Sequence, residues 1–381
     1  MTGNKCNGIT RFLKEKRIFC TVLLAMIFLF TTSIAAYAEQ VAAPTADPAA
    51  GTYGGTQEVA LSTVTEGATI YYTTDSSEPT TGSTLYSAQI EVRSNMTIKA
   101  IAVIEGTDNS PVSTFEYELF AGGDGSVDYP YQVATAEQLN NVRYHLDQHF
   151  IQTEEINLNV APYNEDAGWE PIGSNSSPFT GTFDGNGKTI SNLTIDRSTT
   201  DYVGLFGVTG DTAKIPNVKL ENIKVTGKQC TGALVGENGG TITNSYTTGA
   251  ITGNDYVGGL VGSNTNGGSI TNSYATAAVR GTGFYVGGLV GSNEGTITNS
   301  YATGLVTGNN LVGGLVGWND QGSITNSYAT GAVTGAQPGS GYVGGLVGSN
   351  ADYSTITYSY WDINTSGRTL SQGGTGKTTA D

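Results

Sequence analysis

The sequence predicts an all-β chain: a small antiparallel β-sandwich followed by a right-handed β-helix, or solenoid, with a short capping helix at its N-terminal end. Three observations lead to this prediction. Short β-type runs alternate with turn residues in the region 51–119. Two motifs, Gly-Gly-Leu-Val-Gly and Ile-Thr-Asn-Ser-Tyr, then alternate with a period of roughly 27 residues, which is typical of a repeat architecture. The repeats show no helical periodicity, so their apolar residues fit strands.

Residues 1–38 have the pattern of a secretory signal peptide. Basic residues within 5–17 precede an apolar run at 18–30, and Ala36-Tyr37-Ala38 stands before Glu39. We therefore expect cleavage between Ala38 and Glu39 and a mature chain that is secreted or held at the cell surface. The apolar run is shorter than the ~20 residues of a spanning helix, so we expect no membrane span in the mature chain. An uncleaved N-terminal anchor is the alternative.

Residues 39–50 are rich in Ala and Pro and are predicted as a linker, and residues 51–119 as the sandwich. Turn residues separate five β-type runs in this module. The runs are 57–62, 69–74, 89–93, 97–104 and 114–118.

The sandwich module also resembles a known family in its segments PAAGTY (48–53), GATIYYTTD (67–75), EPT (78–80) and TIKAIAV (97–103). These segments are similar to the chitobiase/β-hexosaminidase C-terminal-type domain. The resemblance implies an accessory β-sandwich of extracellular proteins, often beside carbohydrate-active modules, and it supplies no catalytic residue. Tyr71, Tyr72 and Tyr86 form either a sugar-stacking face or cross-strand packing pairs.

Residues 120–200 are predicted as the N-terminal capping region of the solenoid. Thr135 begins a capping-type sequence, and Leu139, Val142 and Leu146 follow at helical spacing, which predicts a helix over 136–149. Strand-like pieces follow at 150–158, 179–183 and 189–195. A cap at this point protects the unpaired backbone of the first coil.

Residues 201–362 form the repeat array. One unit offers three strand segments, for example 257–261, 269–275 and 277–280, and stacked units build interior ladders in which each buried aliphatic side chain contributes roughly 1.5–3 kcal/mol. We also expect the Asn of Ile-Thr-Asn-Ser-Tyr to form an inward amide ladder. The predicted repeat-core residues are Leu205, Leu234, Leu260, Leu289, Leu315, Leu346, Tyr246, Tyr274, Tyr301 and Tyr328.

The array resembles the GLUG-motif repeats, as in Gly259-Leu260-Val261-Gly262, over about residues 124–381. Those repeats occur in bacterial immunoglobulin A peptidases and in large surface or adhesin-like proteins, and the peptidase activity belongs to a separate domain. The resemblance therefore implies a β-helical stalk and is poor evidence for an activity. Residues 363–381 look like the start of a closing segment and are expected to be an incomplete C-terminal segment.

Charge and cysteine content narrow the choice of partners. The chain has 17 Lys+Arg against 33 Asp+Glu, a net charge of −16, which disfavours nucleic acid because phosphate binding needs a basic surface. Cys6 and Cys20 leave with the signal peptide, so Cys230 would be alone in the mature chain. The fold must then be stabilised by packing and strand pairing.

Candidate chemistry is sparse in this sequence. His145 and His149 have the i, i+4 spacing of zinc ligands, but Leu146 stands where a metallopeptidase helix carries its glutamate. The carboxylates of the array do not recur in register, so no paired acid and base are expected. We predict no catalytic residue, no metal ligand and no cofactor, and weak Ca²⁺ binding to the acidic surface stays open.

The sequence thus favours a non-catalytic scaffold or adhesin-like protein. Two alternatives remain: a carbohydrate-binding accessory protein of an extracellular enzyme system, and an ice- or surface-binding β-solenoid. The second alternative rests on the periodic row of Thr271, Thr298 and Thr325. The expected partner is a glycan or a protein surface of a host or of the environment.

Overall fold

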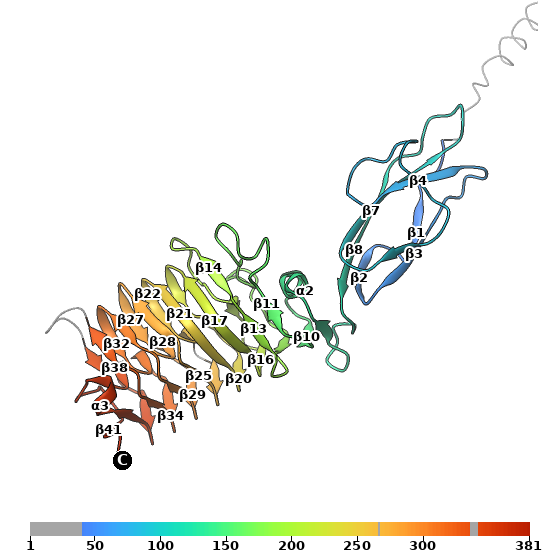
Figure 1. The fold of residues 1–381 in the computed structure, drawn as a ribbon. Coiled ribbons are helices and arrows are strands. Elements are labelled where there is room, and N and C mark those ends of the chain that lie inside the picture. The colour runs from blue at the N-terminus through green and yellow to red at the C-terminus, as the bar shows by residue number, and fades with distance from the viewer. Residues whose placement is uncertain (1–39, 266, 336–341) are drawn as a thin grey trace, which may run out of the picture. The chain divides into compact units, whose positions relative to one another are not determined.

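The structure of the chain, a computed structural model, describes residues 40–265, 267–335 and 342–381. The expected signal peptide and its cleavage point between Ala38 and Glu39 lie outside the described residues. The described residues form two compact units: the first holds residues 40–51 and Gln57–Tyr117, and the second holds Thr52–Thr56 and the described residues from Glu118 onward. The all-β fold class is confirmed, with antiparallel strands in the first unit and a β-solenoid in the second (Figure 1).

The first unit is built from short antiparallel strands. They are β1 (Thr45–Asp47), β2 (Gly51–Gly54), β3 (Gln57–Ser62), β4 (Thr69–Thr73), β5 (Thr84–Leu85), β6 (Ile90–Val92), β7 (Met96–Val103) and β8 (Ser113–Phe120). One sheet has the order β1-β3-β6 and the other β2-β8-β7-β4-β5. Of these strands, β2 and β8 extend past the bounds of the first unit. Val59 and Leu61 are buried on β3, with more exposed residues between and beside them, which is the pattern of a half-buried strand. Each of the five predicted runs overlaps a strand.

The segment 39–50 differs from the linker that its composition predicts. It contributes β1, which pairs with β3 so that Ala46 lies opposite Leu61. Pro44 and Pro48 flank β1 without belonging to it, so no residue of the strand lacks its N–H. The first unit therefore includes residues that precede position 51.

The capping helix is shorter than predicted. α2 (Ala136–Asn141) is followed by a 3₁₀ turn (Val142–Tyr144), and His149 already begins a strand. The hydroxyl of Thr135 accepts the N–H of Gln138 at 3.2 Å, which is the expected N-cap. A helix that reaches 149 is excluded because His149 already pairs with Thr182 as the first residue of β10.

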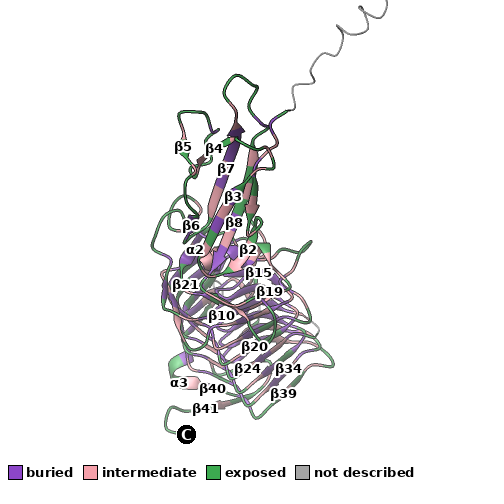
Figure 2. Cartoon of the chain, turned by 90° about the vertical axis from the view of Figure 1, so that its right-hand side faces the viewer, coloured by how far each residue is buried: buried purple, intermediate pink, exposed green. Residues whose placement is uncertain are grey.

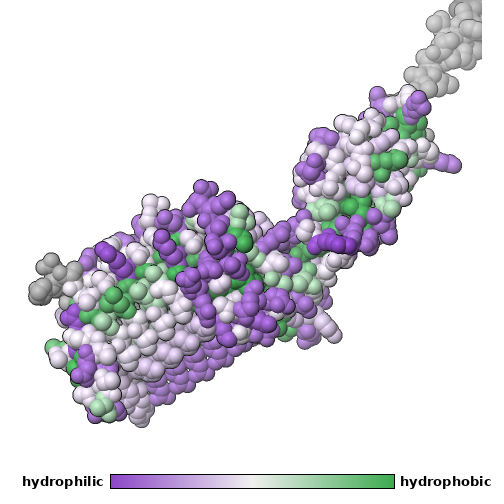
Figure 3. All heavy atoms as spheres, viewed as in Figure 1, coloured by the Kyte–Doolittle hydropathy of each residue, from purple (hydrophilic) through white to green (hydrophobic). Residues whose placement is uncertain are grey.

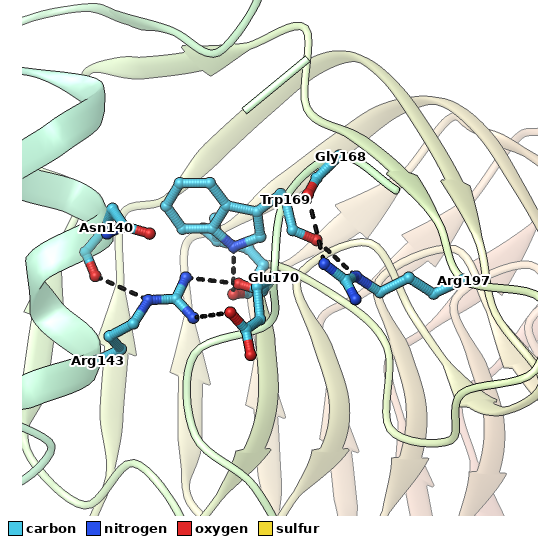
Figure 4. A network of polar contacts seen from close by, with 7 residues as sticks. Asn140, Arg143, Gly168, Trp169, Glu170 and Arg197 are labelled. Atoms are coloured by element: carbon cyan, nitrogen blue, oxygen red, sulfur yellow. Dashed lines mark hydrogen bonds and ion pairs between the residues drawn. The ribbon is translucent and has the colours of Figure 1, made fainter. Parts of the chain in front are cut away.

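Arg143 joins this capping region to the first coil (Figure 4). Its guanidinium donates to the carbonyl of Asn140 at 3.1 Å and to that of Glu170 at 2.8 Å, and it pairs with the Glu170 carboxylate at 3.2 Å. It also lies 5.5 Å from the ring centroid of Trp169, which is fully buried. Arg197 donates to the Trp169 carbonyl from the opposite side at 3.2 Å. The two arginines therefore hold the Trp169 segment between helix and coil.

The second unit stacks its coils through parallel strands that form four sheets (Figure 1). The Thr sheet contains β9 (Tyr131–Val133), β10 (His149–Gln152), β12 (Thr182–Asp184), β16 (Lys214–Pro216), β20 (Thr241–Thr243), β24 (Ser269–Thr271), β29 (Thr296–Thr298), β34 (Ser323–Thr325) and β39 (Thr355–Thr357). The Asn sheet contains β15 (Phe206–Thr209), β19 (Val235–Asn238), β23 (Val261–Asn264), β28 (Val290–Asn293), β33 (Val316–Asn319) and β38 (Val347–Asn350).

The other two sheets complete each coil. The Tyr sheet contains β11 (Ile156–Asn157), β13 (Thr189–Ser191), β14 (Thr194–Asp196), β17 (Lys219–Thr226), β21 (Tyr246–Gly253), β25 (Tyr274–Ala275), β26 (Ala278–Gly281), β30 (Tyr301–Ala302), β31 (Val306–Gly308), β35 (Tyr328–Ala329), β36 (Val333–Gly335), β40 (Tyr360–Asp362) and β41 (Thr375–Lys377). The Val sheet contains β18 (Gln229–Thr231), β22 (Asp255–Gly258), β27 (Phe284–Gly287), β32 (Asn310–Gly313) and β37 (Val343–Gly344). A short helix, α3 (Ile363–Ser366), lies between β40 and β41.

Each coil has more corners than the three predicted strand segments allow. The expected strand 257–261 is split, because β22 ends at Gly258 and β23 begins at Val261. The chain approaches the next coil closely at this corner: a Cβ on Gly288 would lie 2.1 Å from the carbonyl oxygen of Gly314. The paired glycines of the motif are therefore needed so that neighbouring coils can stack.

Candidate functional site

The predicted core leucines lie inside the coils. All six are fully buried, and their backbones continue the ladder from coil to coil, as where Leu289 donates to Leu315 at 2.9 Å. The isoleucine row of the Thr sheet is buried beside them over Ile242, Ile270, Ile297 and Ile324. Figure 2 shows this buried interior repeating along the stacked strands.

The tyrosines that we expected in the core lie on the outside instead. Tyr246, Tyr274 and Tyr301 are half-buried and Tyr328 is 41% exposed. Ala275, the next residue after Tyr274, points inward in its place, since successive side chains on a strand face opposite sides. The four rings form a tyrosine row with centroid distances of 4.8, 4.6 and 4.9 Å and interplanar angles of 7°, 4° and 6°.

The tyrosine row exposes its hydroxyl groups and ring edges to solvent, because the ring faces stack on one another. The hydroxyl of Tyr246 donates to the Glu221 carboxylate. Burial raises the pKa of Tyr246, and the bond to Glu221 raises it further, so this phenol stays protonated. Beyond Tyr328 the stack is followed by Tyr360, whose ring centroid lies 6.0 Å from the Lys377 ammonium, at a depression of roughly 450 Å³. The row can therefore donate hydrogen bonds but holds no nucleophile.

Two further rows lie on the outer face of the Thr sheet. They flank the buried isoleucines, and each row adds one hydroxyl side chain per coil at the strand spacing of about 4.8 Å. The rows are Thr241, Ser269, Thr296, Ser323 and Thr355, and Thr243, Thr271, Thr298, Thr325 and Thr357. In Figure 3 the lower surface of the solenoid shows regular parallel rows of near-neutral and hydrophilic residues. We call these two rows the threonine face.

The inward amide ladder exists, but a different asparagine forms it. In the inner ladder, Asn238 donates from Nδ2 to Oδ1 of Asn264 at 2.8 Å, and this bond repeats from coil to coil at the same length. Its members, Asn238, Asn264, Asn293, Asn319 and Asn350, close the strands of the Asn sheet. The sequence carries a signal for it, since an asparagine recurs shortly after each Leu-Val-Gly.

The asparagines of Ile-Thr-Asn-Ser-Tyr are exposed, so the prediction that they point inward is wrong. Asn244, Asn272 and Asn299 have φ values of 52°, 50° and 50°, which place them at a left-handed corner between the Thr and Tyr sheets. Asparagine tolerates this conformation better than most residues. They form an outer ladder with Asn217 and Asn326, in which the amide bonds measure 3.2–3.3 Å.

The titratable groups considered from sequence are not brought together. His145 follows the 3₁₀ turn and His149 begins β10, so they do not share a helix; His145 hydrogen-bonds to Glu118 instead. Burial raises the pKa of the Cys230 thiol to about 12, so it is not a thiolate at neutral pH. Across the described ranges, His, Cys, Asp and Glu side chains form no group of three that could hold a metal ion. The helices of residues 40–265, 267–335 and 342–381 include none long and apolar enough to cross a bilayer.

These features define a β-solenoid repeat protein that carries a small accessory sandwich. Residues 48–114 match the chitobiase/beta-hexosaminidase C-terminal domain, and residues 253–280, 282–307, 308–334 and 339–362 match the GLUG motif. The chain therefore contains one domain of the first family and an array of GLUG repeats.

Known proteins share parts of this chain. Halomucin of Haloquadratum walsbyi is 34% identical over 200 residues, which are 49% of this chain and 2% of halomucin. A "Putative Gly-rich membrane protein" of Evansella cellulosilytica is 41% identical over 138 residues, which are 35% of this chain and 16% of that protein. The crystal structure of a "putative immunoglobulin A1 protease" from Bacteroides ovatus aligns with a TM-score of 0.59 and 28% identity, covering 68% of this chain and 87% of that one. The chain thus spans a small part of the curated relatives it matches.

Proposed function

We propose that this protein is a non-catalytic scaffold, exported to the cell surface or secreted, whose solenoid presents repeated polar rows to a partner in the manner of an adhesin. The observation that carries this proposal is the register of the outer rows. Hydroxyl, phenol and amide groups recur once per coil on backbone that is hydrogen-bonded to both neighbouring coils. Such a surface is rigid and polyvalent, so weak contacts add up along its length.

The names of the relatives and the chemistry of the side chains support this proposal. Halomucin and the Gly-rich membrane protein have names that fit a surface location. The Cys230 thiol stays protonated, and His145 is paired with Glu118. The protease name of the structural neighbour describes that protein and not this chain.

Two measurements test the proposal. Intact producing cells are treated with an external protease, and the purified full chain is tested for adhesion to immobilised proteins and glycans and for cleavage of immunoglobulin A1. We expect the chain to be removed from the cell surface or found in the medium, to adhere, and to leave the immunoglobulin intact. Retention inside the cell, or specific cleavage that stops in a Cys230→Ser or His145→Gln variant, would refute it.

Carbohydrate binding by the sandwich is a second candidate, supported by the domain family of residues 48–114. Tyr72 and Tyr86 lie edge to face, with ring centroids 6.4 Å apart, and both are half-buried. A glycan array probed with the full chain and with Tyr72→Ala tests it: loss of a glycan signal in the variant supports the candidate, and the absence of any signal rejects it.

The threonine face supports a third candidate, binding to an ordered solid such as ice. Its hydroxyl groups repeat in two directions, by coil and by every second residue along the strand. A measurement of thermal hysteresis with the full chain and with Thr298→Asp decides it. Activity that the charged side chain abolishes supports this candidate, and the absence of hysteresis in the unaltered chain removes it.

A further inference from the structure

Aromatic rings from different coils gather on one outer side of the solenoid. Tyr285 on β27 stacks on Trp318 of β33, with centroids 4.8 Å apart and an interplanar angle of 21°. Tyr256 of β22 lies 4.8 Å from Tyr285 on its other side, and Phe284, 49% exposed, lies 5.9 Å away. The rings therefore form a continuous apolar strip that crosses several coils.

The backbone positions of two of these rings are unfavourable for aromatic residues. Tyr256 and Tyr285 have φ values of 57° and 63°, in the left-handed region that costs a residue with a Cβ roughly 1–2 kcal/mol. At the corner between the Thr and Tyr sheets the chain places asparagine in this conformation. Cys230 and Leu311 take the same conformation at this position of the neighbouring coils, with φ values of 49° and 51°, so the fold requires the left-handed turn here but not a large aromatic side chain.

Carboxylates lie beside the aromatic strip. Glu237 is in register with Trp318 through Ser263 and Ser292, so it occupies the same row on the same face of the Asn sheet. Glu294 and Asp320 follow the inner-ladder asparagines of two consecutive coils, which makes them neighbours. We name the set Tyr256, Phe284, Tyr285, Trp318, Glu237, Glu294 and Asp320 the aromatic–acidic patch.

These carboxylates carry uncompensated charge. Burial raises the pKa of Glu237, and repulsion from the carboxylate of Glu294 raises it further. Burial also raises the pKa of Glu294, and repulsion from Asp320 adds to that shift. The described residues provide no hydrogen bond or ion pair to the carboxylate oxygens of Glu237, Glu294 or Asp320. Asp255, on the Val sheet, shows the contrast: it accepts the N–H of Phe284 at 2.7 Å and the amide of Asn254 at 2.8 Å. Asp255 is therefore held by donors of the protein itself, whereas among the described residues the three patch carboxylates have no such donor.

We propose that the aromatic–acidic patch binds a basic, extended polypeptide segment of a partner protein. Lysine or arginine side chains would lie against Tyr285 and Trp318 and pair with Glu237, Glu294 and Asp320. Cations are attracted both to aromatic faces and to carboxylates, so the two halves of the patch select the same ligand. From the coil of Glu237 to that of Trp318 the patch extends over about 14 Å, three strand spacings, which fits several residues of a linear chain better than a single small cation.

This inference rests on the proposed function, since it gives the chemistry of one partner of the scaffold. It can fail separately, because binding is measured on the purified full chain whatever its cellular location. If the chain adheres but binds no basic peptide, the peptide-binding proposal is wrong and the scaffold proposal stands. If the chain binds the peptide but stays inside the cell, the scaffold proposal is wrong and the peptide-binding proposal stands.

The repeats supply variants that preserve the coil. Serine occupies the position of Trp318 in three other coils (Ser263, Ser292 and Ser349), while Thr265 and Ala351 occupy the row of Glu294 and Asp320. Trp318→Ser and the double variant Glu294→Thr/Asp320→Ala therefore place residues that this fold already accepts. Glu221→Gln, beside Tyr246 on the Tyr sheet, is the matched control, because it removes a carboxylate next to an aromatic ring elsewhere.

The experiment is a titration of the full chain with poly-lysine and with a neutral Gly/Ser peptide of the same length. Binding is followed by Trp fluorescence and calorimetry; Trp169 and Trp361 are buried, so Trp318 should report contact. We expect saturable binding of poly-lysine that weakens in high salt, with affinity at least tenfold lower in both patch variants and unchanged in Glu221→Gln. Equal affinity in all four proteins, or a Trp318 response to neutral chitin oligosaccharides with none to poly-lysine, would overturn the proposal.

Discussion

Two asparagine ladders run along the same solenoid, one inside the coils and one outside. The inner ladder passes through Asn264 and Asn293, and the outer ladder through Asn272 and Asn299. Both repeat the same bond, Nδ2 to Oδ1 of the neighbouring coil, at 2.8 Å inside and at 3.2–3.3 Å outside. Two asparagines of the same coil, such as Asn264 and Asn272, therefore take opposite positions relative to the core.

The two ladders differ in whether water can replace an amide hydrogen bond that is lost. Asn293 uses its second N–H on the carbonyl of Gly295 at 3.2 Å and is fully buried, so water cannot substitute for its partners. Asn299 is exposed, and its amide can exchange its neighbour for water. A buried donor without a partner costs about 1–3 kcal/mol, whereas an exposed one costs little. We conclude that the inner ladder fixes the stack and that the outer asparagines mainly serve the left-handed corner.

The largest expected effect comes from charging the interior of a coil. Leu289→Asp removes a fully buried leucine and places a carboxylate among apolar side chains, so the free energy of unfolding of the solenoid should fall by at least about 4 kcal/mol. Thr298→Asp, on the threonine face, should change it by about 0.5 kcal/mol or less. Limited proteolysis with mass mapping should show new cuts around residues 280–320 in the first variant only.

This pair also tests the independence of the coils. Each coil touches only its neighbours, so damage from Leu289→Asp should spread outward while residues 57–117 stay protected. Equal protection of the two variants, or cutting that begins in the sandwich, would contradict the assignment of inside and outside.

The next effect compares the two ladders directly. Asn293→Ala removes the acceptor of Asn264 and the donor to Asn319, and we expect a loss of about 2–4 kcal/mol from two buried groups without partners. Asn299→Ala should cost about 1 kcal/mol, because alanine is strained at a φ of 50°. Chemical denaturation followed by circular dichroism measures both changes.

Asn299→Gly separates the two roles of the outer asparagine. Glycine keeps the left-handed corner but removes the amide, so its stability should lie within about 0.5 kcal/mol of the parent chain. If Asn299→Gly cost as much as Asn293→Ala, the outer ladder would be a main stabilising element and the comparison would fail.

The ladders also show how far the sequence could be interpreted. The repeats and the leucine register could be predicted because the same motif returns along the chain, at intervals from 26 residues (Leu234 to Leu260) to 31 residues (Leu315 to Leu346). The outward orientation of the Tyr246 side chain could not be predicted in this way. Ile242 and Tyr246 would lie on the same face only if one unbroken strand contained both. The left-handed corner at Asn244 breaks that strand, and Thr247 takes the inward position instead.

Other features depend on stacking and leave no local pattern in the sequence. The helix after Thr135 does not reach His149 as predicted, because His149 and the residues after it pair as the strand β10. Tyr285 and Trp318 occupy different positions of their repeats and meet only when one coil lies on the next. A periodic search of the sequence therefore finds the solenoid but misses the aromatic–acidic patch.

The smallest expected effect concerns a charge at the edge of this patch. Burial, and then Asp320, raise the pKa of Glu294, so the folded chain holds this proton more tightly than the unfolded chain does. The charged carboxylate therefore destabilises the fold above its folded pKa, and this destabilisation vanishes below the pKa of the unfolded chain. Glu294→Thr should raise the free energy of unfolding at neutral pH by about 0.5 kcal/mol, the size expected for a cross-strand like-charge contact, and the gain should fade as the pH falls through the carboxyl range. Urea titrations across that range measure it, with Asp352→Thr on an exposed turn as the control that should show no such gain. If the gain in the free energy of unfolding grew on acidification, or if Asp352→Thr gave an equal gain, the carboxylate of Glu294 would not carry the uncompensated charge that we assign to it in the patch.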